Sequence, residues 1–407
     1  MPPHEHEHEQ TRAPEPTPPA EAKARGTTPR GTTQPRETMR GLPRALQPFL
    51  TWVTGVPLAG SRPRVLWHPT LALAAGAVQT AFGIALGVYA LGRPWYVLVP
   101  LVLLSWPTTA GGMRRLDVVV VHQTLHRMFT GSTAGNRVVS EIVTTLLWRP
   151  PYDGNRQEHL THHAFPCSLK DGDTLYLQST GAGPGMSRRE FRRYLLKAVL
   201  SPAHHGGFLA ARIRANFLTR SPLYRMVMAY THLAGTAVLL ALTGWWLPWL
   251  LFWFLPATFF FQNQTLLYTL SEHRWWLHGN AERLTKAQRD QLTFGRFCGA
   301  PVPDTAGAGP LARCGAWTGW WLRMVLLYAP YRMWILVGDT VQHDLHHVRP
   351  KVDWANSSWI RNEDLATGNA DRYFEAWGGL LTHVYVGNGV RDWTAVPSAP
   401  LTATRAG

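Results

Sequence analysis

Three short segments of the chain carry histidines spaced by about one helical turn. They read HQTLH at 122–126, HLTHH at 159–163 and HDLHH at 343–347. Residues three or four apart on a helix share a face, so the imidazoles of each segment can reach one metal ion from the same side. A further histidine follows an apolar stretch in the letters YTLSEHRWW. The candidate ligands are His122, His126, His159, His162, His163, His273, His343, His346 and His347.

The number of candidate ligands bears on the number and kind of metal ions. Nine imidazoles are too many for one ion, so the sequence predicts two. Imidazole suits zinc, copper, iron and nickel, and ligand type alone does not choose among them. The ligand count and the apolar setting favour two irons, because a redox pair that activates dioxygen can attack an unactivated C–H bond and zinc cannot. An exposed polar stretch is the plain alternative for any one cluster, and three clusters with same-face spacing argue against it.

Four apolar stretches must position these clusters. The first two, 71–91 and 95–113, are separated by only three residues, and the second two, 227–246 and 247–270, follow each other directly. About 20 apolar residues cross a bilayer. We therefore predict four membrane helices in two hairpins, with the histidine clusters in the polar segments outside them.

Charge placement predicts the orientation of the hairpins, because basic residues near span ends favour the cytoplasmic side. The linker 185–225 carries many arginines and the single acid Glu190, whereas the hairpin turns carry at most one basic residue. Both termini and all histidine clusters should therefore be cytoplasmic, in an integral protein of the cytoplasmic (inner) membrane. The apolar stretch 317–338 contains Arg323 and Arg332. An embedded or reentrant helix pair suits it better than a fifth span.

Composition divides the chain into three parts. Residues 1–45 have few large apolar side chains and predict a disordered tail. Residues 46–390 hold the apolar stretches and histidines, and 391–407 predict a flexible C-terminal tail. The formal net charge of +15 fits attraction to the anionic headgroups of a lipid bilayer. Nucleic-acid binding is not expected, because the linker lacks a platform of alternating basic and aromatic residues.

Polar residues near the clusters are candidates for supporting roles. Metal-bound histidines usually donate their other ring N–H to a carboxylate or carbonyl. Asp339 and Asp173 are the preferred candidates for that acceptor, and a solvated charge is the alternative for each. Gln262 and Asn263 lie inside the fourth apolar stretch, where polar groups find partners or line a cavity. With Thr269 they are candidates for a substrate tunnel, and a hydrogen bond to a neighbouring span is the alternative.

In order and spacing, the three clusters resemble the histidine boxes of the integral-membrane fatty acid desaturase family. The letters EHR at 272–274 are similar to the additional histidine that many members carry before the third box. The resemblance covers roughly residues 65–385. It implies a mushroom-like, all-α membrane protein in which a cytoplasmic helical cap holds a non-haem di-iron centre. It also implies an oxygen-dependent enzyme that introduces a double bond into an acyl or alkyl-containing substrate.

Several alternatives stay open beside this resemblance. The same scaffold hosts hydroxylases, and a desaturase of a small non-lipid metabolite is also compatible with the sequence. The chain lacks the H-P-G-G motif of a fused cytochrome b5 domain, which implies an external ferredoxin-like or rubredoxin-like electron donor with its reductase. A metal transporter is the non-enzyme alternative. Transporters place their ligands near the bilayer midplane, whereas these histidines flank the apolar stretches.

Overall fold

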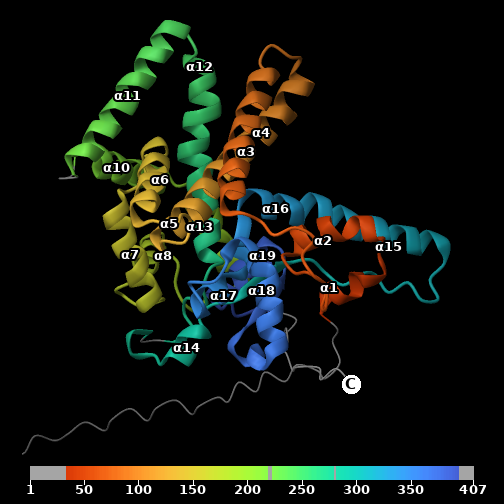
Figure 1. Cartoon of the computed structure of the whole chain (residues 1–407). Coiled ribbons are helices and arrows are strands. Elements are labelled where there is room, and N and C mark those ends of the chain that lie inside the picture. The colour runs from red at the N-terminus through yellow and green to blue at the C-terminus, as the bar shows by residue number, and fades with distance from the viewer. Residues whose placement is uncertain (1–33, 219–221, 279–280, 394–407) are drawn as a thin grey trace, which may run out of the picture.

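The structure is a computed structural model that describes residues 34–218, 222–278 and 281–393. The described chain is mostly helical, and two helical hairpins project from the same side of the molecule (Figure 1). The remaining helices gather at the opposite end of the hairpins. Residues 1–33 and 394–407, which make up most of the two predicted tails, lie outside the described residues.

The first hairpin consists of α3 (Pro69–Ala90) and α4 (Trp95–Arg115), which pack closely along their length. A Cβ atom placed on Gly83 would lie 2.5 Å from the backbone nitrogen of Thr109. Small residues at such crossings let the backbones of membrane helices approach closely. Helix α4 continues through the π-helical turn η3 (Leu116–Val121) into α5 (His122–Leu125). The first histidine cluster therefore lies at the base of this hairpin.

The second hairpin pairs α11 (Leu223–Thr243) with one continuous helical run. The run consists of α12 (Trp246–Trp249), η5 (Leu250–Phe254), η6 (Pro256–Phe260) and α13 (Phe261–Leu270). Within the described residues, three helices are long and apolar enough to cross a membrane: Pro69–Ala90, Trp95–Leu125 and Leu223–Thr243. The run 246–270 is not among them, since its tryptophans, prolines and polar Gln-Asn-Gln segment lower its mean hydropathy. The four-span arrangement stays a prediction.

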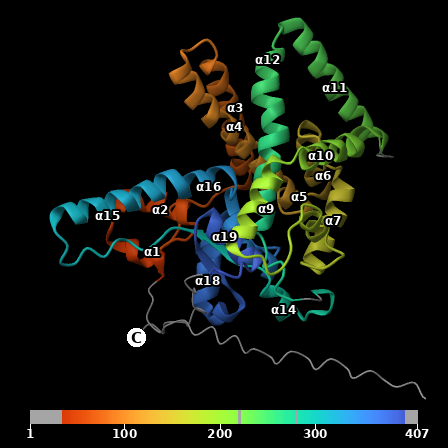
Figure 2. The ribbon, with the colours of Figure 1, turned by 180° about the vertical axis from the view of Figure 1, so that it is seen from behind.

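Five helices connect the two hairpins: α6 (Thr133–Leu146), α7 (Tyr152–Ala164), α8 (Gly172–Ser179), α9 (Arg188–Leu200) and α10 (Pro202–Ile213). Figure 2 shows α9 next to α19 (Leu380–Asn388), and the two share a core with α13. Helix α9 buries Phe191 and Tyr194 in a core that also contains Leu177 and Tyr385. This packing ties the helix of the second histidine cluster, through α8 and α9, to the C-terminal part of the chain.

The C-terminal half contains a strand pair that the sequence did not indicate. Strands β1 (Gly295–Cys298) and β2 (Glu375–Gly378) pair in parallel, with Gly295 opposite Glu375. The prediction of an all-α fold is corrected to this extent. Four-residue strands that pair across about eighty residues leave no periodic signal. The other helices here are α14 (Lys286–Asp290), α17 (His343–Val348) and α18 (Ser357–Asp364).

The stretch 317–338 forms part of one straight helical run rather than a helix pair. Helix α15 (Pro310–Arg323) continues through η8 (Met324–Tyr328) into α16 (Ala329–Trp334) and lies across the base of the first hairpin (Figure 1). The buried Arg332 donates hydrogen bonds to the carbonyls of Trp52 and Gly338, each at 3.1 Å. Backbone carbonyls thus accept hydrogen bonds from one of the two arginines that had argued against a fifth span.

Residues 34–45 belong to the packed part of the chain and not to a disordered tail. They include α1 (Pro35–Thr38), which precedes α2 (Gln47–Thr54). The fully buried Arg36 donates hydrogen bonds to the carbonyl of Val56 at 2.9 Å and to Gln47 Oε1 at 2.8 Å. The polar composition misled here because this arginine is buried and forms hydrogen bonds through Nε and Nη2 inside the fold.

Candidate metal centre

The nine candidate histidines converge where α5, α7, α17 and the end of α13 meet. Their ring nitrogens form two groups, and within each group one nitrogen per residue lies within 4.8 Å of all the others. The first group is His122, His126, His159, His163 and His346. The second group is His162, His273, His343 and His347. The sequence predicted that these side chains act together, and the structure brings all nine of them together; that they bind metal stays a prediction.

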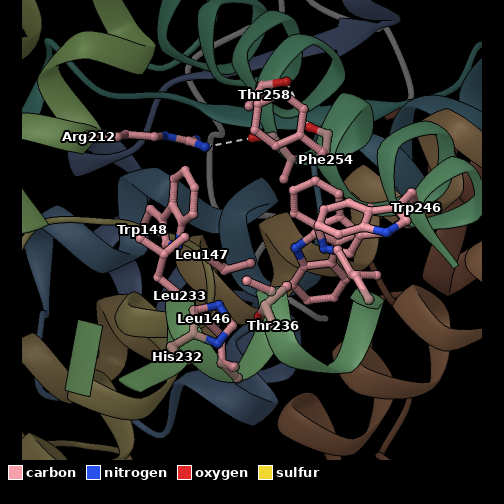
Figure 3. Close-up of a pocket in the computed structure, with 15 residues that line it drawn as sticks. Leu146, Leu147, Trp148, Arg212, His232, Leu233, Thr236, Trp246, Phe254 and Thr258 are labelled. Atoms are coloured by element: carbon pink, nitrogen blue, oxygen red, sulfur yellow. Dashed lines mark hydrogen bonds between the residues drawn. The ribbon is translucent and has the colours of Figure 1, made fainter. Parts of the chain in front are cut away.

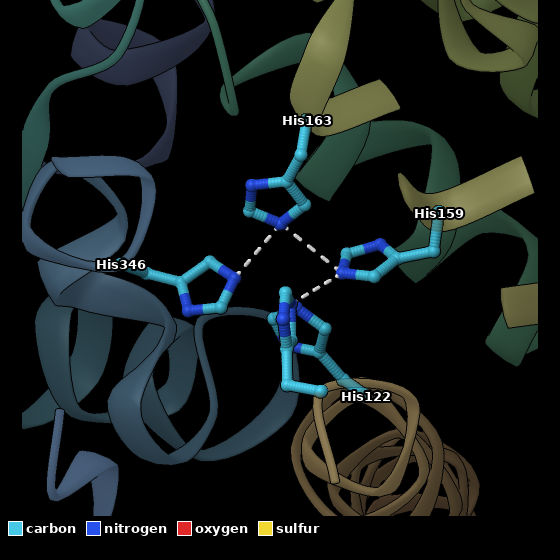
Figure 4. A group of neighbouring side chains, drawn as sticks. His122, His159, His163 and His346 are labelled. Atoms are coloured by element: carbon cyan, nitrogen blue, oxygen red, sulfur yellow. Dashed lines mark hydrogen bonds between the residues drawn. The ribbon is translucent and has the colours of Figure 1, made fainter. Parts of the chain in front are cut away.

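The first group draws side chains from three different elements toward one centre (Figure 4). The Nε2 atom of His159 lies 2.7 Å from that of His126 and 3.1 Å from that of His163, which lies 3.0 Å from that of His346. Imidazole nitrogens bind zinc at about 2.0–2.1 Å, so two ligands at right angles around a comparable ion lie about 3 Å apart. His122 Nε2 is buried without a hydrogen-bond partner in the described chain. This donor set fits one metal ion.

The ring nitrogens of the second group are also about 3 Å apart, and a carboxylate lies beside them. The Nε2 atom of His273 lies 3.0 Å from that of His162 and 3.2 Å from that of His343. His347 Nε2 is buried and has no partner among the described residues. Glu272 Oε1 lies 3.3 Å from His343 Nε2. An oxygen ligand is therefore available here, which the sequence pattern, focused on histidines, did not single out.

The protonation of four of the imidazoles also suits metal binding. Burial, reinforced by neighbouring imidazoles, lowers the pKa of His159, His163, His346 and His347 well below the ordinary value of 6.5. Histidine binds metals as the neutral imidazole. These side chains are thus neutral, and ready to act as ligands, over the whole physiological pH range.

Asp171 is the carboxylate that holds a candidate ligand in place. Its Oδ1 atom lies 3.0 Å from Nδ1 of the buried His162, and its Oδ2 accepts a hydrogen bond from the Cys167 backbone at 3.0 Å. Burial would lower the pKa of His162, but the Asp171 carboxylate outweighs this and raises it to about 10. Asp173, a preferred candidate from the sequence, lies farther away, at 3.6 Å from the same nitrogen.

The preference for Asp339 is corrected by the structure. Residues Gly338–Gln342 form a 3-10 helix, η9, that precedes α17, so Asp339 does not share an α-helical face with His343. It instead accepts a hydrogen bond from Gln123 Nε2 at 2.9 Å. Asp339 therefore links the third histidine cluster to the first through their neighbours and not by contact with an imidazole.

Replacing Asp171 with asparagine is expected to weaken metal retention by about 10- to 100-fold, the usual cost of losing a carboxylate behind a metal-bound histidine. The amide keeps the shape but removes the charge that fixes the Nδ1–H tautomer of His162. Metal content after dialysis against graded chelator measures the effect. Asp173→Asn is the matched control and should change metal retention by less than about threefold. Equal retention in Asp171→Asn and the unchanged protein would contradict this role.

A buried ion-pair network anchors the third cluster. Asp344, which follows His343, accepts hydrogen bonds from Arg361 of α18 at 2.7 and 2.9 Å. Arg361 also reaches Glu375 of β2 at 3.3 Å, and all three side chains are buried. The short strand pair therefore contributes to positioning α17, because it places Glu375 beside the arginine.

A cavity of ≈ 350 Å³ borders both histidine groups. His122, His159 and His162 line it, together with Thr269, one of the tunnel candidates. Gln262 and Asn263 are not among its lining residues. Gln262 Nε2 instead lies 3.1 Å from Nε2 of His204. The structure thus brings only Thr269 of the three tunnel candidates beside the candidate metal centre.

Comparison with known protein families gives one match, to the model described as fatty acid desaturase, over residues 94–361. The matched region is more than half of the chain and contains all nine histidines. The chain belongs to the fatty acid desaturase family. Membership in this family indicates an oxidoreductase, and the apolar helices indicate a membrane protein. Fatty acid desaturases typically hold two irons, which agrees with the two histidine groups. A search among curated proteins gave no significant match to this desaturase-family chain.

Proposed function

We propose that this chain is an oxygen-dependent di-iron desaturase that introduces a double bond into an acyl or alkyl-containing substrate. The observation that carries the proposal is the division of nine buried or half-buried histidines into groups of five and four. The two groups would each hold one iron. When bound, the irons supply the redox chemistry that lets dioxygen and two electrons remove two hydrogens from an alkyl chain.

The protein's own residues would orient the centre and the substrate. The Asp171 carboxylate holds His162 with its Nδ1–H directed away from the second group, which leaves Nε2 free for an ion. Val118, Val121 and Leu125 line the cavity beside His122 and offer an apolar surface to an alkyl chain. Exclusion of water by these side chains would protect reactive species from side reactions.

We propose further that both hairpins span the cytoplasmic membrane, with 246–270 as the fourth span. The common direction of the two hairpins supports this, because the histidine groups then lie together on one side, in a cytoplasmic helical cap (Figure 1). An external ferredoxin-like or rubredoxin-like donor with its reductase would deliver the electrons. Basic residues of the linker, such as Arg189 and Arg193, would face the anionic lipid surface.

Mass spectrometry of lipid and metabolite extracts tests the reaction directly. Cells that make the protein under air are expected to contain a product about 2 Da lighter than its precursor, because desaturation removes two hydrogens. Cells grown without oxygen, or making His159→Ala, should lack the product. A product about 16 Da heavier would show a hydroxylase instead. The absence of any oxygen-dependent product in cells that also supply a ferredoxin and its reductase would contradict the proposal.

A further inference from the structure

Three arginines line one side of the cavity that borders the histidine groups. Arg114, at the base of α4, and Arg212, in α10, are buried, and the half-buried Arg149 lies near them. Their guanidinium groups pack around Phe261, with carbon-to-ring-centroid distances of 5.8, 4.8 and 5.7 Å for Arg114, Arg212 and Arg149. Three cationic side chains from different elements are thus gathered on one side of the cavity.

Two of these arginines keep unsatisfied donors. Arg114 donates through Nη1 to Thr265 Oγ1 at 2.8 Å, and Arg212 donates through Nη1 to the carbonyl of Ala257 at 2.6 Å. The Nε and Nη2 atoms of both side chains are buried without a hydrogen-bond partner in the part of the chain that the structure describes. A buried charged donor without a partner is costly. Such donors are therefore expected to meet a ligand.

The carboxylates that line the cavity do not form ion pairs with Arg114 or Arg212. Asp117 pairs with Arg149, at 3.1 Å from its Nε. The other acids that line the cavity lie on the histidine side, next to or in contact with the candidate ligands: Glu158, Asp171, Asp173 and Glu272. Two bound irons would be the natural counter-charges of those carboxylates. Among the described residues, neither Arg114 nor Arg212 forms a salt bridge with a carboxylate, and Asp117, the acid whose charge acts on both, already pairs with Arg149.

The second pocket that Arg212 borders does not supply an anion either. It is an apolar pocket between α6, α11 and the run 246–260, lined by residues such as Leu147, Trp148 and Phe254 and by no acid (Figure 3). Burial, followed by the charge of Arg149, lowers the pKa of Arg212 to about 9. The carboxylate of Asp117 opposes this shift without cancelling it.

We propose that Arg114 and Arg212 bind the carboxylate of a small aliphatic acid and direct its alkyl chain toward the two histidine groups. This inference rests on the proposed function and adds a substrate class to it. Guanidinium groups match the planar carboxylate with paired hydrogen bonds. The cavity volume of ≈ 350 Å³ lies at the low end of small-molecule sites, about 300–1,000 Å³. A short acid therefore suits it better than a long acyl chain on a large carrier.

Calorimetric titration of the full chain in phosphatidylcholine nanodiscs tests this assignment with octanoate, octanamide and octyl phosphate. Octanoate is expected to bind at least about 10-fold more tightly than its neutral amide. Arg212→Gln should weaken octanoate binding by about 30-fold or more, with octanamide binding unchanged. Arg137→Gln, at an exposed pair with Asp153, is the control and should bind octanoate like the unchanged protein.

Three results would overturn the assignment. Octanoate that binds no more tightly than octanamide would show that no carboxylate site exists. Unchanged octanoate binding by a folded Arg212→Gln would place the carboxylate elsewhere, for example on the metal ions. Tighter binding of octyl phosphate than of octanoate would identify a phosphate site, such as one for a lipid headgroup.

A second measurement needs no variant and serves if Arg212→Gln does not fold. Phenylglyoxal modifies arginines, and mass spectrometry of peptides locates the modified residues. Octanoate, but not octanamide, is expected to slow the modification of Arg212 in the unchanged protein by at least about fivefold. Equal modification with both compounds would contradict the proposal. Iron analysis of the same sample separates the two claims: octanoate protection without iron would overturn only the proposed function, and iron without protection would overturn only the carboxylate site.

Discussion

Replacing His159 with alanine is expected to abolish oxygen-dependent product formation. The Nε2 atom of His159 lies 2.7 Å from that of His126 and 3.1 Å from that of His163. The side chain therefore lies between two other members of the first histidine group, and its loss removes one of the five proposed ligands of that group. The measurement is the rate of formation of the lighter product in membranes supplied with a ferredoxin, its reductase and air.

The matched control for this variant is His205→Ala. His205 belongs to neither histidine group, and its Nε2 atom lies 2.8 Å from the carbonyl of Val199. This variant should form product at a rate within about twofold of the unchanged protein. Product formation by His159→Ala at more than about one tenth of the normal rate would contradict the assignment of the first group as a metal site.

Replacing Arg361 with methionine is expected to lower the free energy of unfolding by about 3–5 kcal/mol, because it removes one partner of a buried ion-pair network. Asp344 and Glu375 are both buried and both contact Arg361. Since Asp344 lies next to His343, the third histidine cluster should also loosen. Chemical unfolding in detergent, together with iron content, measures both effects.

Arg137→Met is the control for the buried network. Arg137 pairs with Asp153 at 2.6 Å, but both side chains are more than a third exposed. Exposed pairs contribute about 0–1 kcal/mol, so this variant should unfold nearly like the unchanged protein. A similar small effect from Arg361→Met would show that the network does not support the third cluster.

The histidine groups could be anticipated from sequence because their signal is local. The spacing in HLTHH and HDLHH places the imidazoles of each cluster on one face wherever the segment is helical, as both are in α7 and α17. The spacing could not predict which histidine belongs to which of the two groups. His162 and His163 are adjacent in the chain yet belong to different groups, and only the packing of α7 against α17 and the end of α13 decides this.

The supporting residues were harder to predict because they depend on exact backbone geometry. Asp339 lies four residues before His343 and would share its face in an α-helix, but residues 338–342 form the 3-10 helix η9, and the carboxylate contacts Gln123. Asp171 precedes α8 and caps it by accepting a hydrogen bond from the Asp173 backbone at 3.0 Å, which also fixes its carboxylate beside His162. Its position at a helix N-terminus was a signal that the sequence offered, since aspartate is favoured there.

The fold shows the same contrast between local and distant interactions. The pairing of α3 with α4 follows from two apolar stretches and a very short turn. The pairing of β1 with β2 and the burial of Arg36 and Arg332 depend on partners distant in sequence or on backbone carbonyls. Composition alone does not place such arginines inside the fold, and only the tertiary structure shows which backbone carbonyls accept their hydrogen bonds.

Elemental analysis of the purified full chain tests the central claim most directly. The account predicts about two irons per chain, with one iron lost in His126→Ala, from the first group, and one lost in His343→Ala, from the second. The double variant should retain almost none. An unchanged protein with fewer than about two metal ions per chain, or one in which zinc replaces iron after aerobic and anaerobic purification alike, would contradict the account of a di-iron centre.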